Sequence, residues 1–511
     1  MFSAWPPYRD RPAPLTFSLP LVSPPDRPDP PRTLGEAIAQ NEALWAVIGE
    51  IREQFERVVD ENEQLREELA RGATSSRTSS KPPSSDSPAQ KAARPKRKRS
   101  TRSKGAQPGH DRHERAALPE SEVDTVSRYF PSGQCGCGSS VLPDTEPSCR
   151  HQVFDLPEVR YRVTEHQLFG GACTGCGKRH VAHAPQDVPS GQMGPGLIAW
   201  IAMMGGEMRL SVSQIQRLLH EQWKLSFSRG AISAAQGKAS TAMARPYADI
   251  VSAARAAPVA HADETRHPRG GGGYPSTWWL WTLATNEACA FHVHYSRGMG
   301  AAEALLGEFA GTLVTDDYAG YNRVPPERRQ LCWAHQLRHF AAIGERGIRS
   351  ARIGRRLELI GRLVVRTRHR LDQAEIDERV YHRRMDRLRA RFVIELERGA
   401  RLPVDGRTRR QCEHLIKREE MLWTFLTDRR VPLTNNLAER AIRGHVLWRK
   451  VAYASHSRRG DEFRARMLSV VTTGRNLGVP IYEYLREICR ESMRPEGVTT
   501  LLPLGVARLP A

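Results

Sequence analysis

An apolar seam runs along the chain between residues 44 and 69. Its members are Leu44, Ile48, Ile51, Phe55, Val58, Asn62, Leu65 and Leu69. Alternating steps of four and three are heptad spacing, and Asn62 occupies an a position, where a buried amide fixes register and favours a parallel dimer. The seam predicts a leucine-zipper-like coiled coil over 33–71 and a homo-oligomer. One amphipathic helix packed on its own chain is the alternative, because the seam is short.

A second helical pattern occupies 188–250. The stretch LSVSQIQRLLHEQW places Ile215, Leu218 and Leu219 on one face. A turn-like KLSFS follows, and then a second short helix with Arg229 near its start. Two short helices joined by a turn fit a helix-turn-helix that binds DNA, with Arg229 as a contact. Any helical hairpin of a bundle would give the same pattern.

Short β-rich runs begin at residue 251. APVAHADET predicts a buried strand with Asp263 near its C-terminal end, and STWWLWTLAT and ACAFHVHY predict a hairpin. GTLVT predicts a fourth strand that ends at Asp316, and QLCWAHQLRHF adds a short strand and opens a helix. TNNLAERAIRGHVLWRK starts a later helix that carries Glu439 in its first turns. The alternation predicts an α/β core in two parts, 251–340 and 431–475.

Three acids therefore stand at the ends of the first and fourth strands and on a later helix. In a ribonuclease-H-like sheet these strands are neighbours and the helix packs against them, which would bring Asp263, Asp316 and Glu439 together. Two Mg²⁺ ions about 3.5–4 Å apart, held by such carboxylates, support in-line displacement at a phosphodiester. Each acid taken alone is better interpreted as an ordinary turn or cap residue, so the prediction depends on all three together.

The spacing of the last two acids predicts an insertion. Asp316 and Glu439 are 439 − 316 = 123 positions apart, too many for one strand–helix step. Residues 341–430 are read as an Arg-rich helical insertion with an apolar face. That face includes Leu357, Ile360, Leu363 and Val364. The insertion lines a DNA channel or forms a solvated helical hairpin, and the sequence favours neither.

Composition narrows the class of partner. The 511 residues contain 77 Lys and Arg against 57 Asp and Glu, a net charge of +20. No apolar run approaches the roughly 18 residues of a membrane span, and the Pro-broken N-terminus shows no secretory signal. We therefore expect no membrane partner, a cytoplasmic, nucleoid-associated location, and a polyanionic partner, with nucleic acid the first choice.

Two stretches of low complexity surround the zipper. The Pro-rich residues 1–32 are expected to be disordered, and 72–118 form a basic linker. Within the linker, Lys96, Arg97, Lys98 and Arg99 either contact DNA phosphates or only solubilise a tether.

Two close cysteine pairs lie between 119 and 187. Cys135 and Cys137 stand in QCGCG, and Cys173 and Cys176 stand in GACTGCGKRH. Glycines beside the cysteines allow tight turns, and four thiolates held in this way suit tetrahedral Zn²⁺. Between the two pairs, VFDLP and YRVTEHQLF show the alternation of apolar and polar residues that is typical of short strands. A zinc-binding, zinc-ribbon-like domain is expected. The first pair is C-x-C, so Cys149 or His151 could replace a ligand, or the site could be a metal-free remnant.

The motifs HADET, TDDYAGYNR, CWAHQLRHF, PLTNNLAERAIR and VTTGRNLGVPIYEYL, in this order and with GAQPGH upstream, resemble the transposase family of insertion sequence 66. The resemblance runs from about residue 34 to 487, and 476–511 hold its last motif and a tail. It implies a multidomain α/β protein with a ribonuclease-H-like catalytic core and an α-helical insertion. Coiled-coil, zinc-ribbon-like and helical DNA-binding segments precede that core.

The resemblance also implies an activity. Asp263, Asp316 and Glu439 would be the DDE triad of a transposase, which uses Mg²⁺ (or Mn²⁺) to cleave DNA at the element's inverted-repeat ends and to join them to target DNA. Cys332 and His335 match a C-x-x-H that would orient the site or only pack. The residues around the third acid that could position DNA phosphates are Asn435, Asn436, Arg440 and Arg443. Accessory proteins of the same element are further expected partners.

Two positions depart from the family pattern. Asp317 stands where the family usually has glycine, and an extra carboxylate there could perturb metal binding or a neighbouring pKa. The C-x-C pair is the other departure. The alternative function is a non-catalytic DNA-binding regulator or an inactivated transposase copy.

Overall fold

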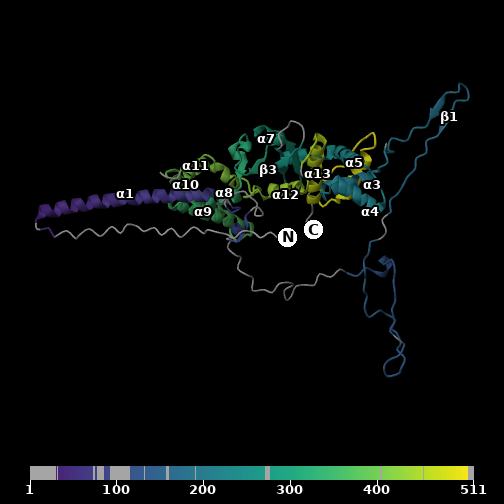
Figure 1. Ribbon diagram of the computed structural model, residues 1–511, viewed down its shortest axis with the longest axis horizontal. Helices are drawn as coiled ribbons and strands as arrows, with labels where there is room; N and C mark the ends of the chain where they lie inside the picture. The colour runs from purple at the N-terminus through teal and green to yellow at the C-terminus, as the bar shows by residue number, and fades with distance from the viewer. Residues whose placement is uncertain are drawn as a thin grey trace, which may run out of the picture. The chain divides into compact units, whose positions relative to one another are not determined.

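The computed structural model describes residues 30–31, 33–72, 75–77, 86–92, 116–131, 133–156, 160–189, 191–270, 277–402, 406–452 and 454–504 (Figure 1). The chain divides into two units, Met1–Leu69 and Ala70–Ala511, and each is described by itself. Nearly all of the stretch 1–32 and the cations Lys96 to Arg99 lie outside the described residues. In the parts of the chain that are described, no helix is long and apolar enough to cross a membrane.

The first unit is built on helix α1 (Leu34–Gly72), 39 residues long. A capping box starts it, because the Glu36 amide donates to Thr33 Oγ1 and the Thr33 amide donates to the Glu36 carboxylate, both at 3.2 Å. The predicted helix is confirmed. The seam side chains Ile51 and Phe55 are 60% and 68% exposed, so this apolar stripe faces solvent.

A five-stranded mixed sheet forms the centre of the second unit, in the order β5-β4-β3-β6-β7. Its strands are β3 (Val259–Pro268), β4 (Thr277–Ala284), β5 (Cys289–His294), β6 (Thr312–Thr315) and β7 (Arg329–Leu331). β3, β4 and β5 pair antiparallel, which confirms the predicted hairpin, whereas β3–β6 and β6–β7 are parallel. The first and fourth strands of the sheet are neighbours, as the sequence predicts.

Both edges of this sheet are covered. On β5, the amides of Cys289 and Phe291 donate to the hydroxyls of Thr473 (3.0 Å) and Ser469 (2.9 Å) on helix α13 (Arg458–Asn476). On β7, the Thr424 hydroxyl donates to the carbonyl of Arg329 at 2.8 Å. Side chains thus satisfy backbone groups that an open edge would offer to another chain.

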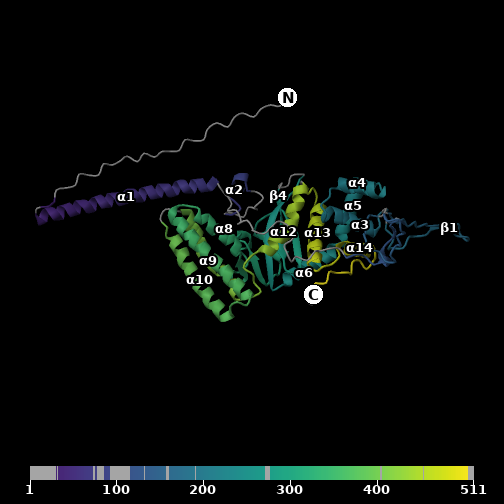
Figure 2. The ribbon, with the colours of Figure 1, turned by 90° about the horizontal axis from the view of Figure 1, so that it is seen from below.

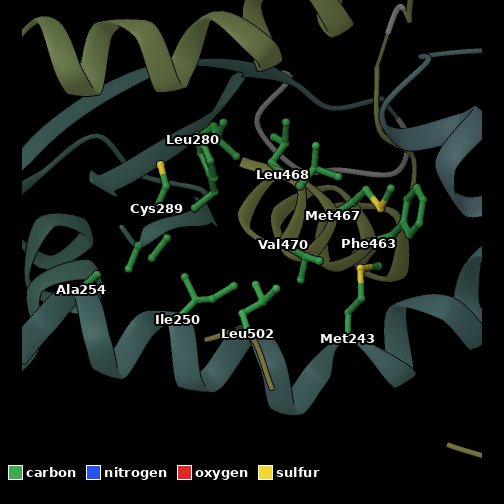
Figure 3. Packing of buried hydrophobic residues seen from close by; sticks show 14 of the residues in the cluster. Met243, Ile250, Ala254, Leu280, Cys289, Phe463, Met467, Leu468, Val470 and Leu502 are labelled. Carbon is green, nitrogen blue, oxygen red and sulfur yellow. The ribbon is translucent and has the colours of Figure 1, made fainter. Parts of the chain in front are cut away.

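One hydrophobic core joins the sheet to helices from both ends of this unit. These helices are α3 (Pro195–Gly206), α4 (Val212–Trp223), α5 (Arg229–Ala242), α6 (Ala244–Ala256), α7 (Met299–Leu306), α12 (Asn436–Val451), α13 and α14 (Ile481–Glu491). Figure 3 shows Val470 of α13 and Ile250 of α6 in this core together with Leu280 and Cys289 of the sheet. The predicted helix pair α4–α5 is present, and it packs into the same core as the strands.

The predicted insertion is helical, and it packs on a second hydrophobic core that also includes Val314 of β6 and Leu331 of β7. Its helices are α9 (Ile348–Asp372), α10 (Glu378–Ala400) and α11 (Gly406–Ile416), and α8 (Trp333–Gly344) connects them to β7. Leu357, Ile360 and Val364 are buried there, so the apolar face packs inside the protein. Figures 1 and 2 show these helices at the β7 end of the sheet, opposite the end where α3 to α5 lie.

The remaining elements are small. Short 3₁₀ helices lie at Glu120–Glu122, Ala319–Tyr321, Pro326–Arg328, Glu419–Leu422 and Thr424–Leu426, and α2 spans Pro88–Ala92. The antiparallel pair β1 (Gly170–Ala172) and β2 (Arg179–Val181) flanks the second cysteine pair. The prediction of strands in VFDLP and YRVTEHQLF is wrong, because residues 151–156 and 160–169 have no regular secondary structure. Their apolar residues, among them Val153 and Leu168, are exposed, so the alternating pattern has no layer to pack against.

Candidate active site

Asp263 and Asp316 meet near the centre of the sheet. β3 and β6 run parallel with His261 opposite Val314, and continuing this register brings Asp263 level with Asp316, the residue that follows β6. Side chains alternate between the two faces of a strand, so Asp263 shares a face with His261. That is the face on which His261 contacts the start of α12.

Asn435 holds the start of α12 against β3. Its side-chain amide donates to the carbonyl of Ala262 at 2.8 Å, and its Oδ1 lies 3.1 Å from His261 Nδ1. Burial lowers the pKa of His261 to about 4, so the ring is neutral at pH 7 and Nδ1–H donates to Asn435. The helix therefore starts beside the residues that precede Asp263, and Glu439 follows within its first turn.

The other acids raise the pKa of Asp263. Burial raises the pKa of Asp263 well above its usual value, and the negative charges of Glu264, Asp316 and Glu439 raise it further. A hydrogen bond of 2.9 Å from the Glu264 amide to Asp263 Oδ1 acts in the opposite direction. Neighbouring carboxylates resist being charged together, and a cation held among them would relieve this repulsion.

A buried arginine fixes the loop that carries Asp316. Arg329 on β7 is fully buried and donates to Thr315 Oγ1, to Asn322 Oδ1 and to the carbonyl of Asp316, each at 3.0 Å. It also donates to the carbonyl of Tyr318 at 2.9 Å, and the Tyr318 amide donates to Asp316 Oδ1 at 3.0 Å. Because these acceptors converge on one rigid guanidinium, the Asp316 carboxylate has a defined position.

Glu264 occupies the opposite face of β3 from Asp263. Its carboxylate accepts from Arg297 (2.8 Å) and from the Tyr321 hydroxyl (2.7 Å). Burial raises the pKa of Glu264, and the charge of Asp316 adds to this effect. The sequence analysis missed Glu264 and Arg329. The adjacent acids of HADET signal a second carboxylate, whereas no signal marks Arg329 as buried.

Asp317 turns away from the three acids toward the insertion. Its oxygens lie 3.0 Å from Arg418 Nη1 and 2.8 Å from His414 Nε2, at the end of α11 and beyond it. Only 12% of the Asp317 side chain is exposed. The carboxylate that departs from the family pattern is therefore paired with a cation and links the Asp316 loop to the insertion.

Cys332 and His335 lie beside the third acid. Cys332 precedes α8 and His335 sits in its first turn, and both are buried. His335 Nδ1 is 3.6 Å from Glu439 Oε1, and the ligand atoms of the three residues all lie within 4.8 Å of one another. The C-x-x-H expected to support the site thus contacts Glu439.

The residues predicted to contact DNA are placed differently from one another. Asn436, Arg440 and Arg443 are exposed on α12 at steps of four and three, which puts them on one side of the helix. Arg229 is exposed at the first position of α5. Asn435 differs, because it is 1% exposed and both polar atoms of its amide are bonded inside the protein.

The cysteine pairs form two separate knuckles. The Gly138 amide donates to the Cys135 carbonyl and the Gly177 amide donates to the Cys173 carbonyl, both at 2.8 Å. Both glycines have positive φ, 89° and 74°. Over the described ranges, the one set of side chains close enough to share an ion is the Cys332 set. The two knuckles are therefore formed individually, and their four thiols are not gathered here.

The family model of the transposase IS66 family matches residues 190–462, just over half of the chain. The chain belongs to this transposase family. The match to the IS66 transposases includes the central sheet, the insertion and Asp263, Asp316 and Glu439. A second model, of a family of unknown function (DUF6444), matches residues 22–116, which include α1 and most of the basic linker.

Three relatives from Sinorhizobium fredii are similar to this IS66 transposase family member. They are the uncharacterized proteins y4hP (26% identical over 66% of this chain), y4qI (24% over 44%) and y4jD (22% over 72%). The chain spans 66%, 46% and 76% of their respective lengths.

Proposed function

We propose that this protein is a DDE transposase that cleaves DNA at the ends of an insertion sequence and joins them to target DNA. The observation that carries the proposal is the register of β3 and β6, which sets Asp263 level with Asp316 on the face that α12 approaches with Glu439. The strand order and this placement of acids support a ribonuclease-H-like core. Family membership supports the same reaction class.

The three acids fit a divalent cation of the Mg²⁺ or Mn²⁺ kind. Carboxylate oxygens are the ligands such hard ions prefer. Burial, and after it the neighbouring negative charges, raise the pKa of Asp263, and a bound cation would balance those charges. Glu439 Oε1 is buried without a hydrogen-bond partner, which leaves it available as a ligand. When bound, the metal would activate the attacking hydroxyl and stabilise the leaving oxygen of a phosphodiester.

The chain's own residues would orient the reaction. Asn435 sets the position of Glu439 relative to Asp263, and Arg329 sets that of Asp316. Arg440 and Arg443 are exposed close to Glu439 on α12 and would bind DNA phosphates. Asn436 is exposed on the same side of this helix and would contact the same DNA. Arg229 on α5 and the linker cations Lys96 to Arg99 are further proposed DNA contacts.

Two ends must be joined to one target, so a multimeric DNA complex is expected. The exposed seam of α1 supports a homo-oligomer through a coiled coil. We further propose that the cysteine knuckles bind Zn²⁺, which would draw them together because a structural zinc ion organises its own site. Accessory proteins of the same element remain proposed partners.

The test is a cleavage assay on DNA that carries the inverted repeats flanking the coding region, with Mg²⁺ or Mn²⁺. Wild type should nick the ends, and Glu439→Gln should lower the rate by about 10²-fold or more while still binding them. Glu397→Gln, at an exposed position of α10, is the matched control and should cleave normally. Binding without any nicking by wild type would favour a non-catalytic DNA-binding protein, and normal nicking by Glu439→Gln would refute the proposed triad.

A further inference from the structure

We propose that Cys332, His335 and Glu439 form a second metal site, for a borderline-soft divalent cation such as Zn²⁺. The site shares Glu439 with the proposed Mg²⁺ carboxylates but differs from them in its sulfur and nitrogen donors. Its effect on cleavage rests on the proposed function, whereas its existence does not.

Three elements hold the donors in place. Cys332 precedes α8, and His335 follows three positions later, so both side chains lie on one side of the helix's first turn. The amide of Asn435 donates to Cys332 Sγ at 3.2 Å, which ties the sulfur to the start of α12. Glu439 lies one turn into α12, so the site is made where β7, α8 and α12 meet.

The distances suit tetrahedral coordination. Zinc binds sulfur at about 2.3 Å and nitrogen or oxygen at about 2.0–2.2 Å, so its ligand atoms lie about 3.4–3.6 Å apart. His335 Nδ1 and Glu439 Oε1 are already 3.6 Å apart. All three donor atoms lie within 4.8 Å, so closing onto one ion requires movements of about 1 Å or less.

Two of the donor atoms have no hydrogen-bond partner. His335 Nδ1 and Glu439 Oε1 are both buried, face each other, and have no hydrogen bond. His335 as a whole is 9% exposed and Cys332 is 0% exposed. Arg338 Nη2 is 3.9 Å from Glu439 Oε1, too far for a hydrogen bond. Buried polar atoms normally find partners, and a cation bound between these two atoms would satisfy both of them.

The sulfur and nitrogen donors of Cys332 and His335 determine which metal ion the site prefers. A thiolate and an imidazole favour Zn²⁺ over Mg²⁺, which prefers oxygen ligands. Binding would release the thiol proton of Cys332 to solvent and form a sulfur–metal bond. If Oε1 of Glu439 binds zinc, that oxygen is no longer available to bind Mg²⁺ together with Asp263 and Asp316. Zinc is therefore inferred to inhibit Mg²⁺-dependent cleavage.

The test uses Co²⁺, a spectroscopic substitute for Zn²⁺ whose bond to a thiolate gives a charge-transfer band. The full chain is used with its five surface cysteines replaced by serine, namely Cys135, Cys137, Cys149, Cys173 and Cys176. Titration should produce a thiolate–cobalt band that saturates at one equivalent. Cys332→Ser should abolish the band, and Cys489→Ser, which changes another buried cysteine, should leave it intact.

Glu439→Gln provides a second variant at a half-exposed position. It should retain the band but weaken Co²⁺ binding at least about tenfold, since even the loss of an outer-shell partner costs 10- to 100-fold. No band in the five-serine protein, or a band that survives Cys332→Ser, would overturn the site. An unchanged Co²⁺ affinity in Glu439→Gln would remove Glu439 from it.

Zinc inhibition separates the site from the proposed reaction. If cleavage occurs, added Zn²⁺ should slow the wild type and should slow Cys332→Ser much less. A cobalt band in a protein that never cleaves would refute the transposase proposal and retain the metal site. Cleavage without a cobalt band would refute the metal site and retain the transposase proposal.

Discussion

Asp263 lies on β3, and Asp316 directly follows the neighbouring parallel strand β6, level with Asp263 when the strand register is continued. The pairing of Val259 with Thr312 has an offset of 312 − 259 = 53, and the two acids are separated by the same 316 − 263 = 53 positions. The backbone register of β3 and β6 therefore sets their separation. By contrast, Glu439 reaches the pair from a helix that Asn435 anchors to the same strand.

Asp316 and Asp317 are adjacent acids for which we predict different effects. Asp316→Asn should lower metal-dependent cleavage by about 10²-fold or more with little change in stability. Asp317→Asn should lower the free energy of unfolding by about 1–3 kcal/mol, because Asp317 accepts charged hydrogen bonds from the insertion. Cleavage rates and urea denaturation of both variants check this prediction.

Asp386→Asn is the control for both substitutions, since Asp386 is exposed on α10. If Asp316→Asn cleaved like the control, Asp316 would have no catalytic role. If Asp317→Asn unfolded like the control, the link to α11 would contribute nothing to stability.

Much of the core could be predicted from sequence, because its strands carry strong local patterns. The hairpin turn between β4 and β5, the strand before Asp316 and the helix bearing Glu439 all lie where predicted. The alternation of apolar and polar residues did not predict the structure of residues 160–169 correctly. Apolar side chains there, such as Val163, are exposed and do not pack against a second layer. Pattern predicts a strand only where a partner surface exists to bury it.

The supporting residues of the site could not be predicted in this way. From the sequence alone, Arg329 would be predicted to lie at the surface, since arginine is almost never fully buried unless it is paired. Its burial depends on acceptors brought together by the loop after β6, which no local pattern encodes. Asn435 reads as a cap or a DNA contact, yet its side chain makes no cap bond and instead bridges α12 to β3.

Arg329→Lys should destabilise the protein although it retains the charge. A lysine cannot reach all four acceptors at once, and each buried acceptor left unbonded costs about 1–3 kcal/mol. The Asp316 loop should loosen, so cleavage should fall as well. Chemical denaturation and the cleavage assay measure the two effects.

Arg366→Lys, at an exposed position of α9, is the matched control and should change neither quantity. Equal stability of Arg329→Lys and this control would show that the loop does not depend on the guanidinium.

Helix α1 is predicted to pair with a second copy through its seam. Ile51→Asp places a charge in the seam and removes an apolar side chain whose burial contributes about 1.5–3 kcal/mol. Self-association of the full chain should therefore weaken by about tenfold or more. Sedimentation velocity over a concentration series measures the change.

Glu50→Ala, next to the seam and exposed, is the control for this substitution and should associate like wild type. A wild type that remains monomeric at high concentration would contradict the coiled coil. The same result for Ile51→Asp and Glu50→Ala would place the contact elsewhere.

The cysteine knuckles are predicted to bind one zinc ion together. Hydrogen bonds from the Ser139 amide and hydroxyl lower the pKa of Cys137 to about 7, and the amides of Cys176 and Gly175 lower that of Cys173. A thiol with a lowered pKa is more often deprotonated at neutral pH, so it binds metal with less competition from protons. Ser139→Ala removes the hydroxyl bond but keeps the stronger amide bond, so it should weaken zinc binding by up to about tenfold, with the larger loss below pH 7.

Zinc content after dialysis against a chelator measures this effect. Cys176→Ser should lose one equivalent, and Cys149→Ser is the matched control because Cys149 is exposed in the same segment. Loss of zinc in Cys149→Ser would make that residue the replacement ligand for the C-x-C pair. Zinc content that Cys176→Ser leaves unchanged would identify the knuckles as metal-free and any bound zinc as belonging to Cys332.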